Sequence, residues 1–242
     1  MKLSILIPTR QRSGQLREFV ESFINNVEDS DFLEFCFRVD KDDIESLNKL
    51  KELNGLYPQI KWCIGNRDMM SKLAVDCYHI STGNLIMLAG DDIRCRNKAF
   101  DIIIIESIKK YPDEIFLLYF EDGYIQKNQR FGTHLIISRK WTELLGYCNP
   151  PYFTGSYIDT YLNRIADILN RKELLPIYVE HLHPAALKSK IDLVMQEKFQ
   201  REAQQRSGEI YYSLHDKILQ EAEKLWRHIC QQKKEYCKNS KN

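Results

Sequence analysis

The chain has 242 residues, of which 43% are hydrophobic and 29% charged, a composition typical of a globular protein with enough apolar material for a full core. Its net charge of +1 gives no general reason to expect a nucleic acid, a membrane or another charged partner. The apolar run after Met1 is too short for a signal peptide, and no stretch reaches the ~18–20 apolar residues of a membrane span. We therefore expect a soluble protein.

The first half of the chain alternates between short apolar runs and one-sided helical patterns. We predict strands at residues 3–7, 33–39, 60–64, 85–89 and 115–120. We predict helices at residues 13–24, 44–53, 68–80 and 98–110. Such alternation is typical of right-handed βαβ units, and it predicts an α/β fold with a mostly parallel sheet flanked by helices.

The pattern changes after Phe120. We predict a strand at 133–138, a short helix through Trp141 and Leu145, a helix at 156–169 and a last strand at 174–180. From about residue 187 the sequence is charged and helical, with a break near Ser207 and Gly208, which predicts two helices packed outside the domain or against a partner. We expect a binding and catalytic domain at 1–184 and a helical extension at 185–242.

The cysteines indicate the redox environment. There are seven, an odd number, widely spaced and without a CxxC pair. This spacing argues against a disulfide framework and against a zinc knuckle. A reducing cytoplasm fits it best, and we expect a cytoplasmic protein.

Polar residues follow three of the predicted strands directly, at residues 8–10, 40–42 and 91–92. In open parallel sheets, ligands bind beyond the carboxyl ends of the strands. The adjacent carboxylates of Asp91 and Asp92 would repel each other there unless a cation sits beside them, and a divalent ion that bridges to phosphate oxygens would satisfy both. The alternative is that one of them caps the next helix or closes a turn.

His183 is a candidate second metal ligand, because His181 and His183 point to the same side of an extended chain that Pro184 ends. A buried or surface histidine without a ligand is the alternative. Mixed Asp and His ligation suits Mn²⁺ or Mg²⁺ carrying a pyrophosphate better than a closed structural zinc site.

Asp159 lies near the start of a predicted helix that faces the same edge of the sheet, where a carboxylate can take a proton from an incoming hydroxyl. The alternative is that it only stabilises the helix dipole. Four cations near the edge could neutralise phosphates, although each alone also fits an ordinary surface charge: Arg10, Arg12, Arg67 and Lys72.

Three segments together resemble the family 2 glycosyltransferases and their relatives with the GT-A fold, particularly the small stand-alone members of bacteriophage and bacterial genomes. They are the opening strand at residues 3–10, Asp40 at the end of the second strand, and the stretch 83–92 that leads to Asp91 and Asp92. The last resembles the approach to the family's DxD metal motif and is the most specific match. The resemblance covers about residues 3–184.

The resemblance implies a role for each matching residue. Pro8 and Thr9 would touch the nucleotide, and Asp40 would read its base or ribose. Asp92 would bind the metal, His183 would complete its shell, and Asp159 would be the catalytic base. With the cations above, the predicted nucleotide-sugar site comprises Pro8, Thr9, Arg10, Arg12, Asp40, Arg67, Ser71, Lys72, Asp91 and Asp92.

The sequence departs from the family's pattern in two places. The usual Asp-Asp-Gly-Ser is replaced by residues 40–43, Asp-Lys-Asp-Asp, and Ile93 occupies the third position of the DxD motif. The Gln-x-x-Arg-Trp of processive polysaccharide synthases is also missing, which implies a single transfer. The implied reaction moves a sugar from a nucleotide diphosphate, expected to be a UDP-sugar, to an acceptor hydroxyl with inversion, using Mn²⁺ or Mg²⁺.

The acceptor stays open between a saccharide and a hydroxylated DNA base. Residues 224–242 carry six Lys or Arg against the single Glu235, which mildly favours DNA. Two other functions are alternatives to this reaction. A sugar nucleotidyltransferase needs a Gly-rich loop after the first strand, where only Gly14 occurs. A non-catalytic carbohydrate- or nucleic-acid-binding module is disfavoured by the presence of all the implied site residues.

Overall fold

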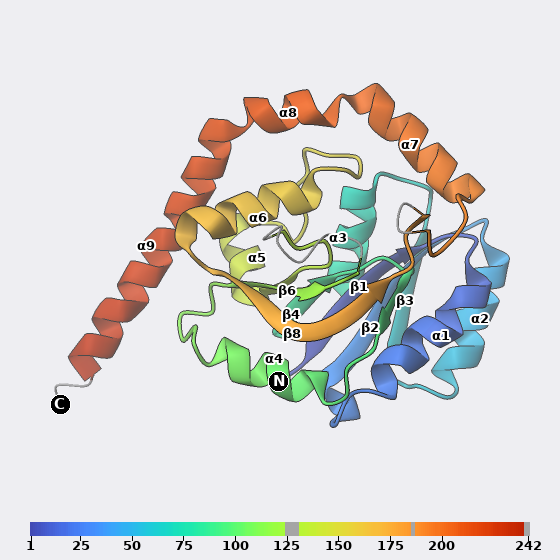
Figure 1. Cartoon of the computed structure of the whole chain (residues 1–242), viewed down its shortest axis with the longest axis horizontal. Helices are drawn as coiled ribbons and strands as arrows, with labels where there is room; N and C mark the ends of the chain where they lie inside the picture. The colour runs from blue at the N-terminus through green and yellow to red at the C-terminus, as the bar shows by residue number, and fades with distance from the viewer. Residues whose placement is uncertain (124–130, 185–186, 240–242) are drawn as a thin grey trace.

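The computed structural model describes residues 1–123, 131–184 and 187–239 (Figure 1). The strands are β1 (Leu3–Thr9), β2 (Leu33–Asp40), β3 (Ile60–Gly65), β4 (Leu85–Leu88), β5 (Ile93–Cys95), β6 (Leu117–Glu121), β7 (Ile136–Ser138) and β8 (Lys172–His181). The helices are α1 (Ser13–Ile24), α2 (Ile44–Asn54), α3 (Met70–Ile80), α4 (Phe100–Ile108), α5 (Arg139–Leu145), α6 (Ile158–Leu169), α7 (Leu193–Gln205), α8 (Ser207–Ser213) and α9 (His215–Asn239), with a 3₁₀ turn η1 (Ser30–Phe32).

The strands of the described residues form one sheet in the order β3-β2-β1-β4-β7-β6-β8-β5. β1 to β4 pair in parallel, and β6 and β8 run in the same direction, while β7 and β5 run antiparallel to their neighbours. The predicted mostly parallel α/β sheet is therefore confirmed. The short β5 was not predicted, because three residues are too few to show a strand periodicity.

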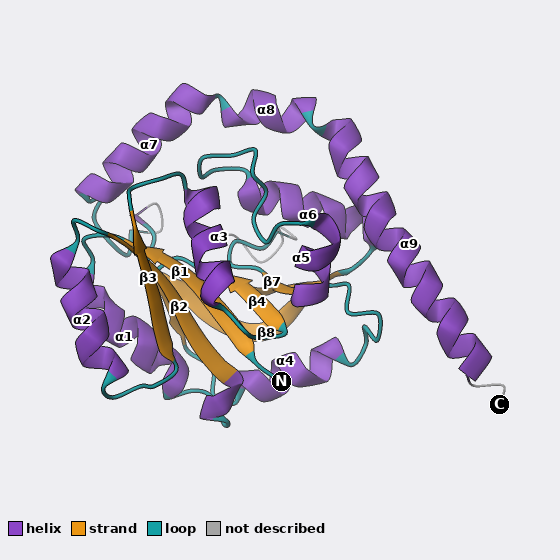
Figure 2. Ribbon diagram, turned by 180° about the vertical axis from the view of Figure 1, so that it is seen from behind, coloured by secondary structure: helices purple, strands orange, loops and turns teal. Residues whose placement is uncertain are grey.

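Helices cover both faces of the sheet (Figure 2). One core cluster joins the sheet to α1, α2 and α4, and a second joins it to α3, α5, α6 and α9. An apolar stripe determines which face of α1 packs on the sheet. Leu16, Phe19, Val20 and Phe23 recur at helical spacing and are all buried. β2 is buried along its whole length because it lies inside the sheet with a helical layer on each side.

The C-terminal residues form an arch of helices rather than the two predicted ones (Figure 1). The chain turns at Arg206, which takes a left-handed conformation with φ 55°, and again at Leu214 between α8 and α9. The first turn lies next to the predicted break at Ser207. The second was missed because no Gly or Pro accompanies it. α7 thereby reaches the carboxyl ends of the strands, while α9 packs on α5 and α6.

A buried carboxylate attaches α9 to the domain. Glu221 accepts hydrogen bonds from the hydroxyls of Tyr161 (2.9 Å), Tyr152 (3.3 Å) and Tyr147. Burial, together with the Glu221 charge, raises the pKa of all three tyrosines, so they remain donors at neutral pH. The extension is therefore joined to the loop after α5 and to α6 by polar contacts as well as by apolar packing.

Glu221→Ala is expected to lower the free energy of unfolding by about 3 kcal/mol, because three buried or part-buried hydroxyls lose a charged acceptor. Urea unfolding followed by circular dichroism measures the change. Glu223→Ala is the matched control on the same helix, since Glu223 is exposed and pairs only with Arg227 in the described contacts, and it is expected to cost less than about 0.5 kcal/mol. Equal losses in the two variants would contradict the anchoring role.

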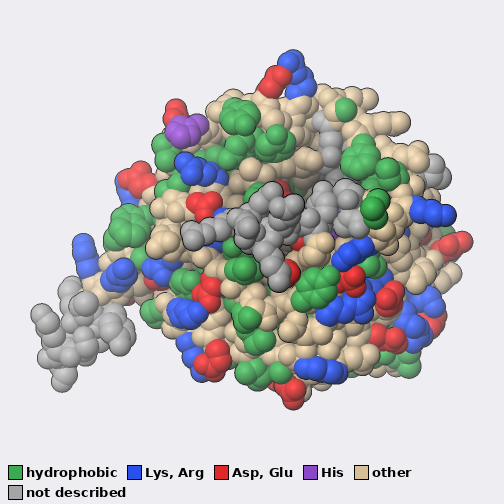
Figure 3. Space-filling view, in the orientation of Figure 1, with side chains coloured by type: hydrophobic (Ala, Val, Ile, Leu, Met, Phe, Trp, Pro, Cys, Tyr) green, Lys and Arg blue, Asp and Glu red, His purple; other side chains and the backbone are tan. Residues whose placement is uncertain are grey.

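Charged side chains of both signs lie on the surface of the domain (Figure 3). Positive and negative side chains are interspersed over the face seen in Figure 3, in keeping with the net charge of +1. Within the described part of the chain, every helix is too short or too polar to cross a membrane.

Candidate active site

A cavity of about 550 Å³ lies at the carboxyl ends of β1, β2 and β4. It is closed by the start of α3, residues 154–160, the end of β8 and Met195 of α7. Its charged lining comprises five aspartates, three arginines and three histidines: Asp40, Asp68, Asp91, Asp92, Asp159, Arg10, Arg12, Arg67, His134, His181 and His183. The acidic excess disfavours an anionic ligand unless a cation accompanies it.

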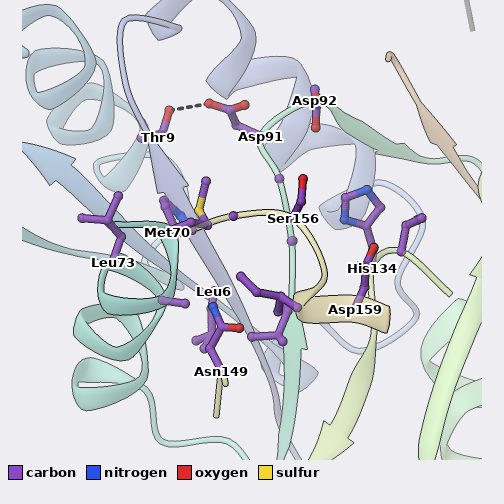
Figure 4. Close-up of a pocket in the computed structure, with 18 of the residues that line it drawn as sticks. Leu6, Thr9, Met70, Leu73, Asp91, Asp92, His134, Asn149, Ser156 and Asp159 are labelled. Carbon is purple, nitrogen blue, oxygen red and sulfur yellow. Dashed lines mark hydrogen bonds between the residues drawn. The ribbon is translucent and has the colours of Figure 1, made fainter. Parts of the chain in front are cut away.

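Asp91 connects two strand ends and is buried. Its carboxylate accepts hydrogen bonds from Thr9 Oγ1 at 2.7 Å (Figure 4) and from Arg12 at 2.6 Å. Arg12 also donates to Asp192 at 2.9 Å, and Asp192 caps the start of α7. Burial raises the pKa of Asp91, while Arg12 and Thr9 oppose that rise. This carboxylate therefore fixes the floor of the cavity and links it to the C-terminal extension.

Asp92 lies beside two histidines. Ligand atoms of Asp92, His134 and His181 all lie within 4.8 Å of one another, and His181 Nε2 is 3.6 Å from Asp92 Oδ2. Ligand atoms sit about 2.0–2.2 Å from a small divalent ion, so these three groups need only small rotations to share one. One carboxylate and two imidazoles make a donor set that fits a divalent metal.

The backbone explains why these three groups meet. β5 follows Asp92 directly and pairs with the end of β8, so that Ile93 lies opposite His181. β7 pairs with β4, which brings His134 to the same edge. Gly90 leaves room for the cluster, because a Cβ there would lie 2.5 Å from Asp92 Oδ1. Any side chain at position 90 would displace that carboxylate.

The charges of the cluster stabilise one another. Burial alone would raise the pKa of Asp92, but the hydrogen bond and charge of His181, with smaller contributions from His134 and Arg12, hold it well below its usual range. Burial alone would lower the pKa of His181, but Asp122 and Asp92 raise it to about 9. At neutral pH His181 is therefore protonated and supplies positive charge in place of a cation.

Asp40, predicted to read the nucleotide, is held by two arginines at the cavity wall. Its carboxylate accepts hydrogen bonds from Arg10 at 2.9 Å and from Arg38 at 3.1 Å. Arg10 also binds Asp42 through both terminal nitrogens, while its buried Nε has no hydrogen-bond partner among the described residues. Arg10 is thus oriented by two carboxylates at the cavity wall.

The other predicted nucleotide-binding residues divide into two groups. Pro8, Thr9, Arg12 and Arg67 line the cavity, and Arg67 forms an ion pair with Glu197 of α7. Ser71 is buried in α3, and Lys72 points outward and pairs with Asp68 at 2.7 Å. The structure therefore places Ser71 and Lys72 behind the wall of the cavity, among the described residues that do not line it.

Asp159 lines the cavity from the first turn of α6. The preceding Tyr157 has a left-handed conformation with φ 71°, which ends the loop and sets the direction of the helix. The Asp159 carboxylate accepts from the backbone of Thr160 at 2.8 Å. The predicted base and the predicted metal ligand Asp92 thus face one cavity from different elements.

His183 also lines the cavity, with its ring 5.1 Å from that of His181. The compact cluster of described residues, however, contains His181 and His134. Sequence reasoning missed His134 altogether. His134 lies two residues before β7, and this position predicts a site residue only when it is known that β7 pairs with β4.

The cavity has a second, apolar end. It is lined by Leu6 and Leu88 from the sheet, Leu73 and Ala74 from α3, Leu135, and Ile158 from α6. Asn149 lies among them, and Figure 4 shows it with Leu6 at the end of the pocket away from Asp91 and Asp92.

The fold is similar to that of solved sugar transferases. A mannosyltransferase from Pyrobaculum calidifontis, solved with GDP-Man and Mn²⁺, aligns with a TM-score of 0.60 and 9% identity over 74% of this chain and 56% of its own. Residues 1–349 of S. aureus TarS with UDP-GlcNAc align with a TM-score of 0.61 and 14% identity, over 85% of this chain and 66% of that structure's own chain. TarS 1–349 without a stated ligand aligns with a TM-score of 0.60 and 15% identity, over 74% of this chain and 60% of its own.

These likenesses show that the chain has the GT-A fold. The chain spans 56–66% of the length of these three solved structures. No protein-family model and no curated protein matches its sequence.

Proposed function

We propose that the chain is a metal-dependent glycosyltransferase, which moves a sugar from a nucleotide diphosphate to an acceptor hydroxyl. The observation that carries the proposal is the cluster of Asp92, His134 and His181 at the carboxyl edge of a GT-A sheet, in one cavity with Asp159. The donor is proposed to be a UDP-sugar. The acceptor is proposed to be a saccharide or a hydroxylated DNA base, and the excess of Lys and Arg in residues 224–242 mildly supports the DNA base.

The acidic lining supports a metal requirement. A diphosphate would add negative charge to a cavity in which aspartates already outnumber arginines. Asp92, His134 and His181 would hold the ion. A bound divalent cation supplies charge neutralisation for the departing diphosphate. Imidazole ligands favour Mn²⁺ over Mg²⁺, which prefers oxygen donors.

The remaining chemistry belongs to the side chains. Arg10 and Arg12, held by carboxylates, would donate to the nucleotide diphosphate. Asp159 takes the proton from the acceptor hydroxyl as that oxygen attacks the anomeric carbon. Met195 and the ion pair of Arg67 with Glu197 bring α7 over the cavity, which helps to exclude water. A single displacement inverts the anomeric centre.

Thermal-shift measurements with UDP, GDP and ADP, each with and without Mn²⁺, test this function without knowledge of the acceptor. A nucleotide that binds only the folded protein stabilises it by about 2.7 kcal/mol at one hundred times its dissociation constant. We expect stabilisation by UDP that requires Mn²⁺ and is reversed by a chelator. No shift with any nucleotide and metal would reject the proposal.

Metal binding is expected to strengthen with pH. Imidazole must be neutral to bind a metal, and the pKa of His181 is raised to about 9 by Asp122 and Asp92 despite burial. Below that pH each binding event must release a proton, so the apparent Mn²⁺ affinity should rise about tenfold per pH unit towards pH 9 and then level off. Calorimetric titration at two pH values, in buffers of different ionisation enthalpy, measures both affinity and proton release.

The raised pKa of His181 makes the metal-free protein less stable, not more, as the pH rises. Because the folded pKa of His181, about 9, exceeds the ordinary value of 6.5, its stabilising contribution is complete below pH 6.5 and is lost as the pH rises through 9. A Mn²⁺ affinity that does not change with pH in this window would contradict the assignment of His181 as a ligand.

A further inference from the structure

The apolar end of the cavity contains a polar group that the fold does not use. Asn149 is only 3% exposed, and its side-chain Oδ1 has no hydrogen-bond partner in the described part of the chain. Buried amides are normally paired, because leaving one unsatisfied costs its full desolvation. Figure 4 shows the amide directed into the pocket beside Leu6. An amide at the base of an apolar chamber is an arrangement that a ligand would complete.

The chemistry of the chamber restricts that ligand. Leucines from the sheet and from α3 form its walls, and they offer no partner to a hydroxyl group. The Asn149 amide offers an acceptor and donors, which match the N–H and C=O of another amide. A small group that joins an amide to a methyl therefore fits the chamber better than a bare sugar ring.

The position of the chamber indicates which part of a substrate enters it. Ile158, on its wall, is the neighbour of Asp159 in the chain. In the proposed function, on which this inference rests, Asp159 lies near the anomeric carbon of the donor sugar. The substituent on C2 is attached to the adjacent ring atom. Because Ile158 and Asp159 line the same cavity, a substituent on C2 would be the part of the donor that reaches the chamber, whereas the nucleobase would lie at the far end of the diphosphate.

We propose that this chamber binds the acylamino group of a 2-acetamido sugar in the donor, and that Asn149 selects such donors by pairing with that amide. The apolar walls contact the acetyl methyl. A donor with a 2-hydroxyl has neither the acyl carbonyl nor the methyl group, so it offers Asn149 a single short hydroxyl and leaves the apolar walls without a contact. Asn149 is therefore a specificity-determining residue for the donor.

The test compares Mn²⁺-dependent binding of UDP-GlcNAc and UDP-Glc by calorimetry in the absence of an acceptor. The wild-type chain is expected to prefer UDP-GlcNAc by about tenfold or more, because a site built around a hydrogen-bonding group rejects ligands that lack it. Asn149→Leu is expected to bring the two affinities within about twofold of each other. Asn48→Leu, the same change at an exposed position of α2, should keep the wild-type preference.

Thermal unfolding shows whether the variant is folded, and its midpoint should equal or exceed that of the wild type, because the substitution removes a buried amide oxygen that has no partner among the described residues. Equal binding of the two donors by the wild type would overturn the proposal and leave the glycosyltransferase assignment intact. A preference that persists in Asn149→Leu would also overturn it. If neither donor and no UDP binds with Mn²⁺, the proposed function fails as well.

Discussion

Replacing Asp159 by Asn is expected to lower kcat by about a thousandfold, because an amide of the same shape cannot accept a proton from the acceptor. Donor binding should change little, since Asp159 lies on α6 and apart from the metal cluster. Turnover with the identified acceptor, or donor hydrolysis where none is known, measures the effect. Binding of UDP with Mn²⁺ by the variant separates a chemical defect from a folding defect.

Asp167→Asn provides the matched control for this experiment. Asp167 is on the same helix, is 47% exposed and pairs with Lys172 outside the cavity. Its replacement should leave turnover within about twofold of the wild type. If Asp159→Asn kept turnover within a few-fold of the wild type, another group would be the base. A product that retains the donor's anomeric configuration would exclude the single displacement.

Replacing Asp92 by Asn is expected to weaken Mn²⁺ binding by more than about a hundredfold, since even an outer partner of a metal ligand contributes about 10–100-fold. The variant loses the anionic ligand of the cluster and keeps two imidazoles. Transfer should fall in parallel, and UDP should no longer stabilise the protein when Mn²⁺ is added. Titration with Mn²⁺ followed by electron paramagnetic resonance measures free and bound ion directly.

The two histidines near Asp92 can be separated by the same titration. The geometry predicts that His181→Ala weakens Mn²⁺ binding as strongly as Asp92→Asn, because both belong to the compact cluster. The sequence instead predicts a ligand role for His183. A large loss in His183→Ala with little change in His181→Ala would show that the cluster rearranges when it binds metal.

The arrangement of the sheet could be predicted from the sequence to a large extent. Buried parallel strands such as β1 and β2 are continuous apolar runs, and the polar residues that end them mark the ligand edge. α1 begins at the predicted Ser13, although no side-chain hydrogen bond caps its start. These features are local, so a single sequence contains them.

The cluster of Asp92, His134 and His181 could be predicted only in part. Asp92 follows an apolar strand and was identified, but His134 and His181 depend on which strands become neighbours. That neighbourhood is set by β5 and β7, of three residues each, whose pairing involves residues distant in the chain. The ion pairs of Arg10 and Arg12 with Asp40 and Asp91 were missed for the same reason, since separations of 30 and 79 residues leave no local pattern.

The pairing of β5 with β8 also determines when the cluster of Asp92, His134 and His181 can form. Asp92 and His181 are 89 positions apart, and they meet only after β8 has docked beside β5. A ribosome adds about 5–20 residues per second, so a growing chain holds Asp92 for several seconds before His181 is even synthesised. Any ion that this cluster binds is therefore expected to enter late in the biosynthesis of the chain, because a shorter chain has Asp92 without His181.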